Sequence, residues 1–238
     1  MVVIVVTGAA SGIGAALART LVARGERVAG LDRGEGAFVT HRVDLSDAEA
    51  IPSVASELDG VAGLAHVAGL PGTKAPADIF AVNSHAPYRL TKAIAPGADV
   101  PVVIVGSVTA DRADRDAAEA VLRGEVPDVP GKQAYEISKL AAKLQMLRLL
   151  GEGYRANLVA PGPVRTPILA DFEQSIGAEH LDRAASLTGG HGEPEAVADV
   201  IAFLLSPASR WVRGQVVKAD GGLHGLREAA ALETSGWR

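Results

Sequence analysis

Short runs of apolar residues alternate along the chain with longer segments in which apolar residues recur every three or four positions. The runs suit strands buried on both faces of a parallel sheet, and the expected strands are 2–6, 27–31, 38–43, 61–68, 100–105, 155–160 and 215–219. The periodic segments predict helices at 15–21, 46–58, 77–95, 112–123, 132–151 and 193–205. This alternation predicts an α/β fold with a doubly wound parallel sheet, the Rossmann fold.

Three residues refine the predicted helices. Ser46 is placed to cap the helix that runs to residue 58, because its hydroxyl can accept a hydrogen bond from a free amide there. Pro87 is expected to kink the helix at 77–95 or to mark a boundary in it. Pro194 suits an early position of the helix at 193–205.

Composition limits the classes of function. The 238 residues suffice for a single domain, and hydrophobic residues at 48% with aromatic residues at 4% predict a core of small aliphatic side chains. The net charge of −5 and the lack of a basic run argue against a nucleic-acid partner. Because the chain has neither a signal peptide nor an apolar stretch of bilayer length, we expect no membrane partner and a cytoplasmic location.

The chain contains no cysteine, which excludes disulfides, thiolate metal sites and thiol nucleophiles. Its six histidines are scattered, and none falls in a His-Glu-x-x-His pattern. We therefore expect no metal site.

The first strand leads into the glycine-rich turn TGAASGIG and then into a helix. Gly8, Gly12 and Gly14 lack a Cβ atom, so the backbone can approach a ligand, and the amides at the helix start attract a phosphate. A plain tight turn is the alternative. Because the turn follows a strand, opens a helix and precedes a second strand, we expect it to bind the pyrophosphate of a dinucleotide.

Asp32 ends the second strand, eighteen residues after Gly14. A carboxylate at this place can accept hydrogen bonds from both ribose hydroxyls of an adenosine and repels a 2′-phosphate. The expected cofactor is therefore NAD. Arg33 leaves NADP open, because its guanidinium can bind that phosphate, and Asp32 can also be an ordinary turn residue.

Tyr135 and Lys139 lie four residues apart on the helix at 132–151 and therefore share one face of it. A nearby ammonium favours the phenolate, so we expect Lys139 to lower the pKa of the Tyr135 phenol toward the range useful for proton transfer. The alternative is a solvated pair without chemistry.

Other candidate residues follow the ends of strands, where a doubly wound sheet binds its ligands. Ser107 follows the strand at 100–105, and Tyr135 lies 28 positions after it. Residues 108–132, which the resemblance described below implies to be a helical insertion, connect that strand to the helix of Tyr135. Residues 165–192 mix apolar positions with Gly189, Gly190 and Gly192, and form either a mobile substrate lid or a pair of ordinary surface helices.

Together these motifs resemble the short-chain dehydrogenase/reductase family, and the resemblance covers nearly the whole chain. It implies the catalytic residues Asn83, Ser107, Tyr135 and Lys139. It also implies contacts to the cofactor from Gly8, Ser11, Gly12, Ile13, Gly14, Asp32, Asp44, Leu45, Ala68, Gly69, Tyr135, Lys139, Pro161, Gly162, Val164 and Thr166.

The chain departs from the common family pattern at two places. His66-Val67-Ala68-Gly69 stands where many members have Asn-Asn-Ala-Gly, and the segment between Ser107 and Tyr135 is long. The insertion resembles the bacterial 3-alpha-hydroxysteroid dehydrogenase/carbonyl reductase group. The resemblance implies a homo-oligomer, either a dimer or a tetramer. The insertion would lie near the helices that many members use to form tetramers, which argues against a tetramer and favours a dimer.

The resemblance implies hydride transfer between NAD(H) and a secondary alcohol or ketone, with a hydrophobic, alicyclic or steroid-like small molecule as the expected substrate. Tyr135 then acts as general acid and base, Ser107 binds the substrate oxygen, and Asn83 supports a water that relays protons from Lys139. An NADPH-dependent biosynthetic ketoreductase, a non-redox enzyme such as a lyase, and a cofactor-sensing module remain as alternatives.

Overall fold

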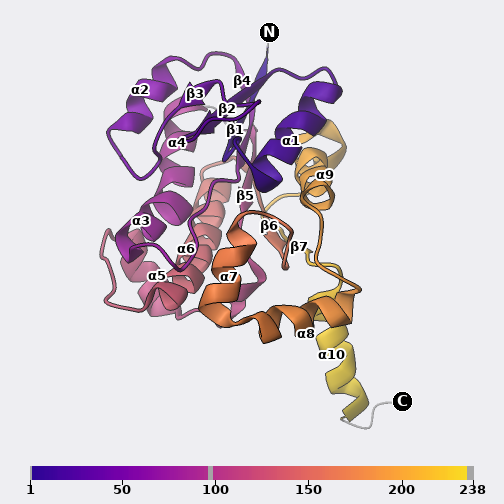
Figure 1. Cartoon of the computed structure of the whole chain (residues 1–238). Coiled ribbons are helices and arrows are strands. Elements are labelled where there is room, and N and C mark those ends of the chain that lie inside the picture. The colour runs from indigo at the N-terminus through magenta and orange to yellow at the C-terminus, as the bar shows by residue number, and fades with distance from the viewer. Residues whose placement is uncertain (1, 96–98, 235–238) are drawn as a thin grey trace.

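A computed structural model describes residues 2–95 and 99–234 and places seven parallel strands in one sheet (Figure 1). The strands are β1 (Val3–Thr7), β2 (Val28–Asp32), β3 (His41–Arg42), β4 (Val61–His66), β5 (Pro101–Val105), β6 (Arg155–Pro161) and β7 (Val216–Ala219). Their order is β3-β2-β1-β4-β5-β6-β7. The chain thus winds outward from β1 in one direction and then in the other, which puts the switch point of a doubly wound sheet between β1 and β4.

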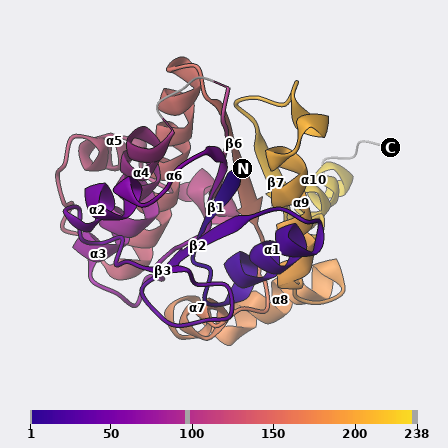
Figure 2. The same cartoon turned by 90° about the horizontal axis from the view of Figure 1, so that it is seen from above.

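Helices cover both faces of the sheet (Figure 2). On one face α1 (Gly12–Ala23) and α9 (Pro194–Leu205) pack through buried residues such as Leu17 and Ile201. On the other face lie α2 (Ala50–Ser56), α4 (Ala86–Ile94) and α6 (Gly131–Gly151). Strands β5 and β6 are buried along their whole length. β5 is accordingly a continuous apolar run, whereas β6 contains Arg155 and Asn157, whose buried side chains are hydrogen-bonded.

The segment between β5 and α6 forms its own small core. It contains the 3-10 turn η2 (Val108–Arg112) and the helix α5 (Arg115–Leu122), close to the helix expected at 112–123. Together with α3 (Pro76–Phe80), α5 packs against α6 in a cluster that includes Phe80, Val121 and Ile137. The insertion therefore covers the outer face of the helix that carries Tyr135.

The helix expected at 77–95 is interrupted. Between α3 and α4 the chain makes one π-helical segment, η1 (Ala81–His85), and Pro87 then lies in the first turn of α4. A π turn widens the backbone hydrogen-bond spacing and often marks a functional position. It carries Asn83.

Two predictions about the third βα unit were wrong. The strand expected at 38–43 is only the two residues of β3. The residues just before β3 form no strand, because Gly30 of β2 hydrogen-bonds there to Thr40, with its amide to the Thr40 hydroxyl and its carbonyl to the Thr40 amide. Ser46 does not cap a helix. Its amide and hydroxyl both donate to Asp44 Oδ1, at 2.9 and 2.7 Å, and α2 begins only at Ala50.

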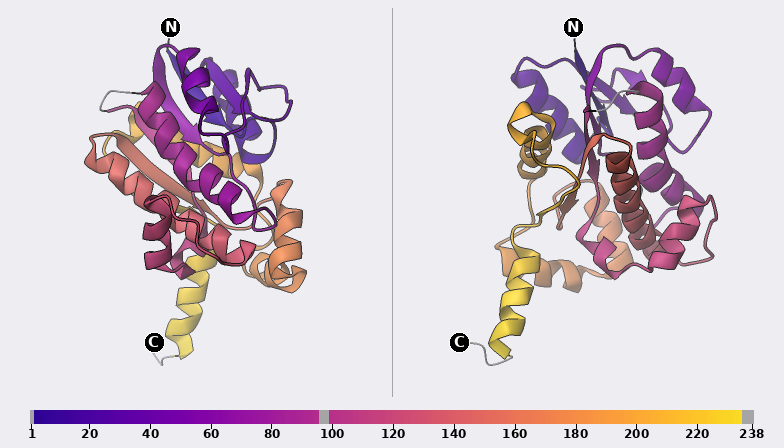
Figure 3. Two further views of the ribbon diagram at one scale, coloured as in Figure 1. Left: turned by 90° about the vertical axis from the view of Figure 1, so that its left-hand side faces the viewer. Right: turned by 180° about the vertical axis from the view of Figure 1, so that it is seen from behind.

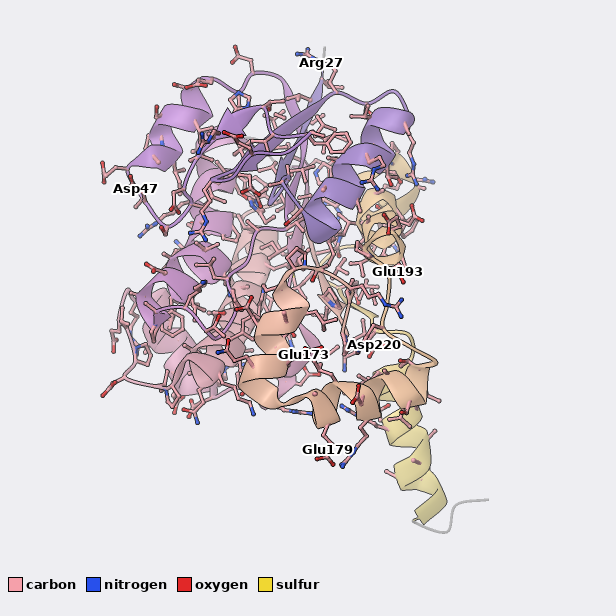
Figure 4. The ribbon with its side chains drawn as sticks, viewed as in Figure 1. Arg27, Asp47, Glu173, Glu179, Glu193 and Asp220 are labelled. Atoms are coloured by element: carbon pink, nitrogen blue, oxygen red, sulfur yellow. The ribbon has the colours of Figure 1, made fainter. Side chains whose placement is uncertain are left out.

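The helices α7 (Ile168–Ile176) and α8 (Ala178–Thr188) lie across the carboxyl edge of the sheet (Figure 1). The tail after β7, to which the sequence assigned no element, forms α10 (Leu223–Thr234), and residues 235–238 of the tail lie outside the described residues. Figure 3 shows α10 projecting away from the body. Asp220, labelled in Figure 4, caps its start through the amides of Gly222 and His224. No helix in the described part of the chain is long and apolar enough to cross a bilayer.

Candidate active site

One cleft of about 390 Å³ at the carboxyl ends of the strands brings the candidate residues together. All of the residues expected to contact a cofactor line this cleft, from Gly8 on the first turn to Thr166 at the start of the α7–α8 segment. Ser107, Tyr135 and Lys139 line it as well, whereas Asn83 does not. A concave site at the switch point of a doubly wound sheet is where such folds bind ligands.

The glycine-rich turn has no room for a side chain at Gly8 or Gly14. A Cβ atom on Gly14 would lie 2.1 Å from the carbonyl oxygen of Gly8, so the start of α1 can approach β1 only with glycine at this position. Gly8 itself has φ +73°, and a Cβ atom there would lie 2.9 Å from the amide nitrogen of Ala68. The turn thus exposes its backbone to the cleft at the start of α1, where a phosphate is favoured.

Two hydroxyls complete this turn. Thr7 is buried, and its Oγ1 accepts hydrogen bonds from the amides of Val67 and Ala68, both at 3.0 Å. Thr7 therefore fixes the loop after β4 against the glycine turn. Ser11 is the N-cap residue of α1, but its side chain makes no capping hydrogen bond and lines the cleft instead.

Asp32 is held by the backbone at the far end of the cleft. Its Oδ2 accepts the amide of Ala10 at 3.1 Å, and its Oδ1 accepts the amide of Gly34 at 2.9 Å. Each carboxylate oxygen retains a lone pair for a further donor, such as a ribose hydroxyl. The glycine turn without side chains and this oriented carboxylate therefore fit the phosphates and the adenosine ribose of a dinucleotide.

Arg33 lies beside Asp32 but is oriented toward Asp44. Its Nη1 atom is 4.0 Å from Asp44 Oδ2, and both side chains are about half exposed. The hydrogen bonds from Ser46 to Asp44, helped by the charge of Arg33, lower the pKa of the Asp44 carboxyl. Asp44 therefore stays ionised and can retain the guanidinium by electrostatic attraction.

Tyr135 and Lys139 are both buried at the other end of the cleft. Their exposed fractions are 8% and 4%, which excludes the interpretation of this pair as solvated surface residues. The Nζ atom of Lys139 lies 5.5 Å from the centroid of the Tyr135 ring and donates a hydrogen bond to the carbonyl oxygen of Val105 at 3.0 Å.

The pKa values of this pair differ from the expectation. Burial raises the pKa of the Tyr135 phenol to about 12, an effect that a hydrogen bond with Ser107 only partly offsets. Burial also lowers the pKa of Lys139 to about 8. The pKa of the phenol therefore lies above its ordinary value and not, as we expected, below it, because burial removes the phenolate from water. The phenol is protonated at neutral pH.

Ser107 lies between β5 and η2, where it caps the 3-10 turn. Its Oγ accepts the amide of Thr109 at 3.2 Å and the hydroxyl of Thr109 at 3.0 Å. These two bonds orient the serine toward the cleft that it lines with Tyr135. Two hydroxyls thus converge at one point, the arrangement needed to bind a carbonyl or carbinol oxygen.

Asn83 acts behind the cleft. Its Oδ1 accepts the amide of Leu70 at 2.7 Å, and its Nδ2 donates to the carbonyl of Leu70 and to Ser138 Oγ, both at 3.0 Å. The side chain thereby joins the loop after β4 to α6. A water relay through Asn83 stays a prediction, and these bonds already occupy its side chain.

The two ends of the segment 165–192 are held next to each other by hydrogen bonds. Val164 and Gly192 form a parallel bridge, the amide of Arg165 donates to Gly192, and the Arg165 side chain pairs with Glu193, labelled in Figure 4. The helices α7 and α8 lie between these two fixed ends. This arrangement suits a lid that moves about its base.

Three residues that line the cleft, Lys74, Asp171 and Phe172, were not predicted as site residues. The ring of Phe172 on α7 meets the ring of Tyr135 edge-on, with centroids 5.1 Å apart. Asp171 and Lys74 also line the cleft, and Thr73 donates to Asp171 Oδ1 at 2.6 Å. These residues come from segments far apart in sequence, so only the fold brings them together. No three His, Asp or Glu residues in the described ranges gather as ligands for a metal ion.

Comparisons with known proteins agree with this geometry. A family model described as enoyl-(acyl carrier protein) reductase matches residues 8–224. The chain is 34% identical to coniferyl-alcohol dehydrogenase of a Pseudomonas species, over 92% of this chain and 95% of that protein. It is 32% identical to 3-alpha-hydroxysteroid dehydrogenase/carbonyl reductase of Comamonas testosteroni, over 94% and 96%. The crystal structure of the 3-alpha-hydroxysteroid dehydrogenase from Pseudomonas sp. B-0831 complexed with NADH superposes with a TM-score of 0.82 at 32% identity, over 96% of this chain and 99% of that one.

Proposed function

The chain belongs to the short-chain dehydrogenase/reductase family and is an oxidoreductase that acts on alcohols, and we propose that it interconverts a hydrophobic secondary alcohol and its ketone with NAD(H). The observation that carries the proposal is the cleft itself. It joins the glycine turn and Asp32 at one end to Ser107, Tyr135 and Lys139 at the other.

The residues present fit a nicotinamide dinucleotide. The glycine turn and the hydroxyl of Ser11 would hold its phosphates, Asp32 its adenosine ribose, and Lys139 its nicotinamide ribose. When bound, the cofactor supplies or accepts the hydride. Pro161, Gly162, Val164 and Thr166 line the same cleft and would position the nicotinamide.

Tyr135 is the proton donor and acceptor in this proposal. A phenol that is protonated at neutral pH can donate to a carbonyl oxygen in reduction. In the oxidation direction the same group must accept a proton, and the ammonium of Lys139 supports that step because it favours the charged phenolate. Ser107 hydrogen-bonds the substrate oxygen and keeps it within reach of the phenol.

Asp32 supports NAD over NADP. Its carboxylate is fixed by two backbone amides and cannot turn away from a 2′-phosphate without losing them. Arg33, the residue that would favour NADP, lies near Asp44 instead. The solved structure of a relative in complex with NADH agrees with this choice. A nicotinamide-dependent enzyme draws on the cofactor pool inside the cell, which supports a cytoplasmic location.

The apolar wall of the cleft supports a hydrophobic substrate. Leu70, Pro71, Ile168 and Phe172 line the cleft, and the ring of Phe172 lies against that of Tyr135. The relatives act, by their names, on coniferyl alcohol and on 3-alpha-hydroxysteroids, both of which contain rings. We therefore propose an alicyclic or steroid-like alcohol as the substrate class.

A homo-oligomer is also part of the proposal. Phe203 on α9 is 47% exposed, and Trp211 after it is 95% exposed. Large apolar side chains this exposed are typical of surfaces that meet another protein chain. Light scattering coupled to size-exclusion chromatography distinguishes a monomer from a dimer or a tetramer.

The function is tested with the purified protein, NAD⁺ and a set of alicyclic secondary alcohols, by the absorbance of the reduced nicotinamide. The expected result is oxidation of at least one alcohol, and Tyr135→Phe should lower kcat by roughly a hundredfold to ten-thousandfold. Calorimetric titration of the same variant with NAD⁺ should give nearly the affinity of the unaltered protein.

Two outcomes contradict this function. Retained turnover in Tyr135→Phe removes the proposed proton donor. Failure of the unaltered protein to bind either NAD⁺ or NADP⁺ in the titration removes the redox function and favours a non-redox enzyme. Clear preference for NADP⁺ leaves an oxidoreductase but shifts its function toward a biosynthetic reductase.

A further inference from the structure

Lys74 is a charged residue of the cleft that the proposed chemistry does not use. The apolar residues Leu70, Ile168 and Phe172 line the cleft, and the charged residues Lys74, on the loop after β4, and Asp171, next to Phe172 on α7, line it as well. Asp171 already accepts the hydroxyl of Thr73. Lys74 makes no ion pair with any residue in the described part of the chain. Lys74 is exposed and lines the cleft, so a ligand there has no protein partner to displace from its ammonium.

The loop that carries Lys74 is fixed to the helix of Tyr135. The amide of Lys74 donates to the carbonyl of Pro71 at 3.2 Å, which closes a turn. Within this turn, the backbones of Gly72 and Gly131 touch. A Cβ atom on Gly131 would lie 2.1 Å from the oxygen of Gly72, and one on Gly72 would lie 2.9 Å from the oxygen of Gly131.

Asn83 fixes the same loop from its other side, through the amide and carbonyl of Leu70. The loop therefore moves with α6 and not with the lid. The backbone of this loop therefore keeps the first atoms of the Lys74 side chain at a fixed position relative to the phenol of Tyr135. A rigid base lowers the entropy that a flexible side chain loses on binding.

We infer that Lys74 binds a carboxylate carried by the substrate on the side of its ring remote from the carbinol. This rests on the proposed function. The carboxylate of such a substrate can form an ion pair with the Lys74 ammonium at the mouth of the cleft while the substrate ring stays against Leu70 and Phe172. A single cation with the charged Asp171 nearby suits a monoanion better than a phosphate dianion. The substrate class is therefore an alicyclic hydroxy acid or keto acid.

The test compares two probes that differ only in charge, cyclohexanecarboxylate and cyclohexanecarboxamide. Calorimetry on the protein saturated with NAD⁺ measures their binding without any turnover. The unaltered protein should bind the carboxylate more tightly than the amide. Lys74→Met should lower the affinity for the carboxylate by roughly tenfold and the affinity for the amide by less than about twofold. The matched control is Lys132→Met, which removes the same charge from an exposed residue of α6 that does not line the cleft.

A second measurement uses 4-hydroxycyclohexanecarboxylate and its carboxamide as substrates. The ratio of their kcat/KM values should fall by roughly tenfold in Lys74→Met and stay constant in Lys132→Met. Equal binding of the two probes by the unaltered protein, or an equal loss of both in Lys74→Met, overturns the inference. Turnover of neutral alcohols with no preference for the acid overturns only the role of Lys74, whereas failure to bind NAD⁺ overturns the proposed function.

Discussion

Thr73 and Asp171 lie 98 positions apart in the sequence and are joined by a hydrogen bond of 2.6 Å across the mouth of the cleft. Thr73 belongs to the loop that is fixed to α6, and Asp171 belongs to α7, which lies in the segment closed at its base by Val164 and Gly192. The bond thus joins a fixed wall to the candidate lid. In this closed arrangement Phe172, the next residue on α7, lies against the ring of Tyr135.

We predict that Thr73→Val loosens the lid. The valine has a similar shape but cannot donate, so Asp171 loses its partner from the fixed wall. A hydrogen bond to a partly exposed carboxylate contributes on the order of 1 kcal/mol, so KM for the alcohol should rise by roughly threefold to tenfold. Steady-state kinetics on the alcohol found in the screen measures this change.

A double-mutant cycle and a control variant test the prediction about the lid. Asp171→Asn should raise KM similarly, and the double variant Thr73→Val with Asp171→Asn should be no worse than either single variant, because both remove one bond. Glu173→Gln changes the same charge on the same helix, where Figure 4 labels it, and should leave KM unaltered. Additive effects in the double variant would show that the two residues act separately.

Asp32 yields a prediction about the choice of cofactor. Asp32→Asn removes the charge that repels a 2′-phosphate, and NAD⁺ also loses an acceptor for its ribose hydroxyls. The ratio of the dissociation constants for NADP⁺ and NAD⁺ should fall by at least about tenfold. Calorimetric titration with each cofactor measures this ratio directly.

Arg33 provides the control for this change. With the repulsion gone, the guanidinium near Asp44 is the cation within reach of the added phosphate. Adding Arg33→Gln to Asp32→Asn should therefore reverse most of the gain in NADP⁺ affinity. An unaltered ratio of the NADP⁺ and NAD⁺ dissociation constants in Asp32→Asn would mean that this carboxylate does not contact the adenosine ribose.

Tyr135 yields a prediction about pH. Because burial raises the pKa of its phenol to about 12, the ligand-free protein should keep this group protonated through pH 10. Subtracting the near-ultraviolet titration of Tyr135→Phe from that of the unaltered protein isolates the phenolate of Tyr135. The difference should stay flat until about pH 11. A rise near pH 9 would show that Lys139 outweighs burial even without ligands.

The sequence predicted the parts of the fold that depend on local patterns. The parallel sheet, the glycine turn and the helix of Tyr135 follow from apolar periodicity and from glycine, which act within a few residues. The resemblance to the short-chain dehydrogenase/reductase family and to the 3-alpha-hydroxysteroid dehydrogenase/carbonyl reductase group is confirmed by the relatives found. Most of the expected cleft residues come from these same local motifs.

The remaining features depend on long-range packing. The contact between Thr73 and Asp171 needs the lid to fold back over the sheet, and no periodicity in either segment signals it. The pKa of Tyr135 depends on how deeply α6 is buried and on Phe172, neither of which can be read from the spacing to Lys139. The π turn at Asn83 has a partial signal in Pro87, which cannot donate within a regular helix.

His66 occupies the place where many relatives in the family have asparagine, and it is buried beneath the cleft with 3% exposure. The hydroxyl of Thr91 donates to the carbonyl of Pro87 at 2.7 Å, so its oxygen accepts from His66 Nε2, 2.8 Å away. Burial lowers the pKa of His66 to about 3. The folded protein therefore holds this imidazole neutral, with its proton on Nε2.

This histidine makes the fold sensitive to acid. In the unfolded chain His66 binds a proton below its ordinary pKa of 6.5, whereas in the folded chain it binds one only below about pH 3. The free energy of unfolding therefore falls as the pH drops through this window, by about 1.4 kcal/mol per pH unit. His66→Gln keeps a donor for Thr91 but cannot titrate, so its free energy of unfolding should fall less steeply by that amount. Urea unfolding between pH 7 and pH 4.5 measures both slopes, and His224→Gln, an exposed histidine paired with Glu228, serves as the control. Equal slopes for the unaltered protein and His66→Gln would mean that His66 accepts a proton without unfolding.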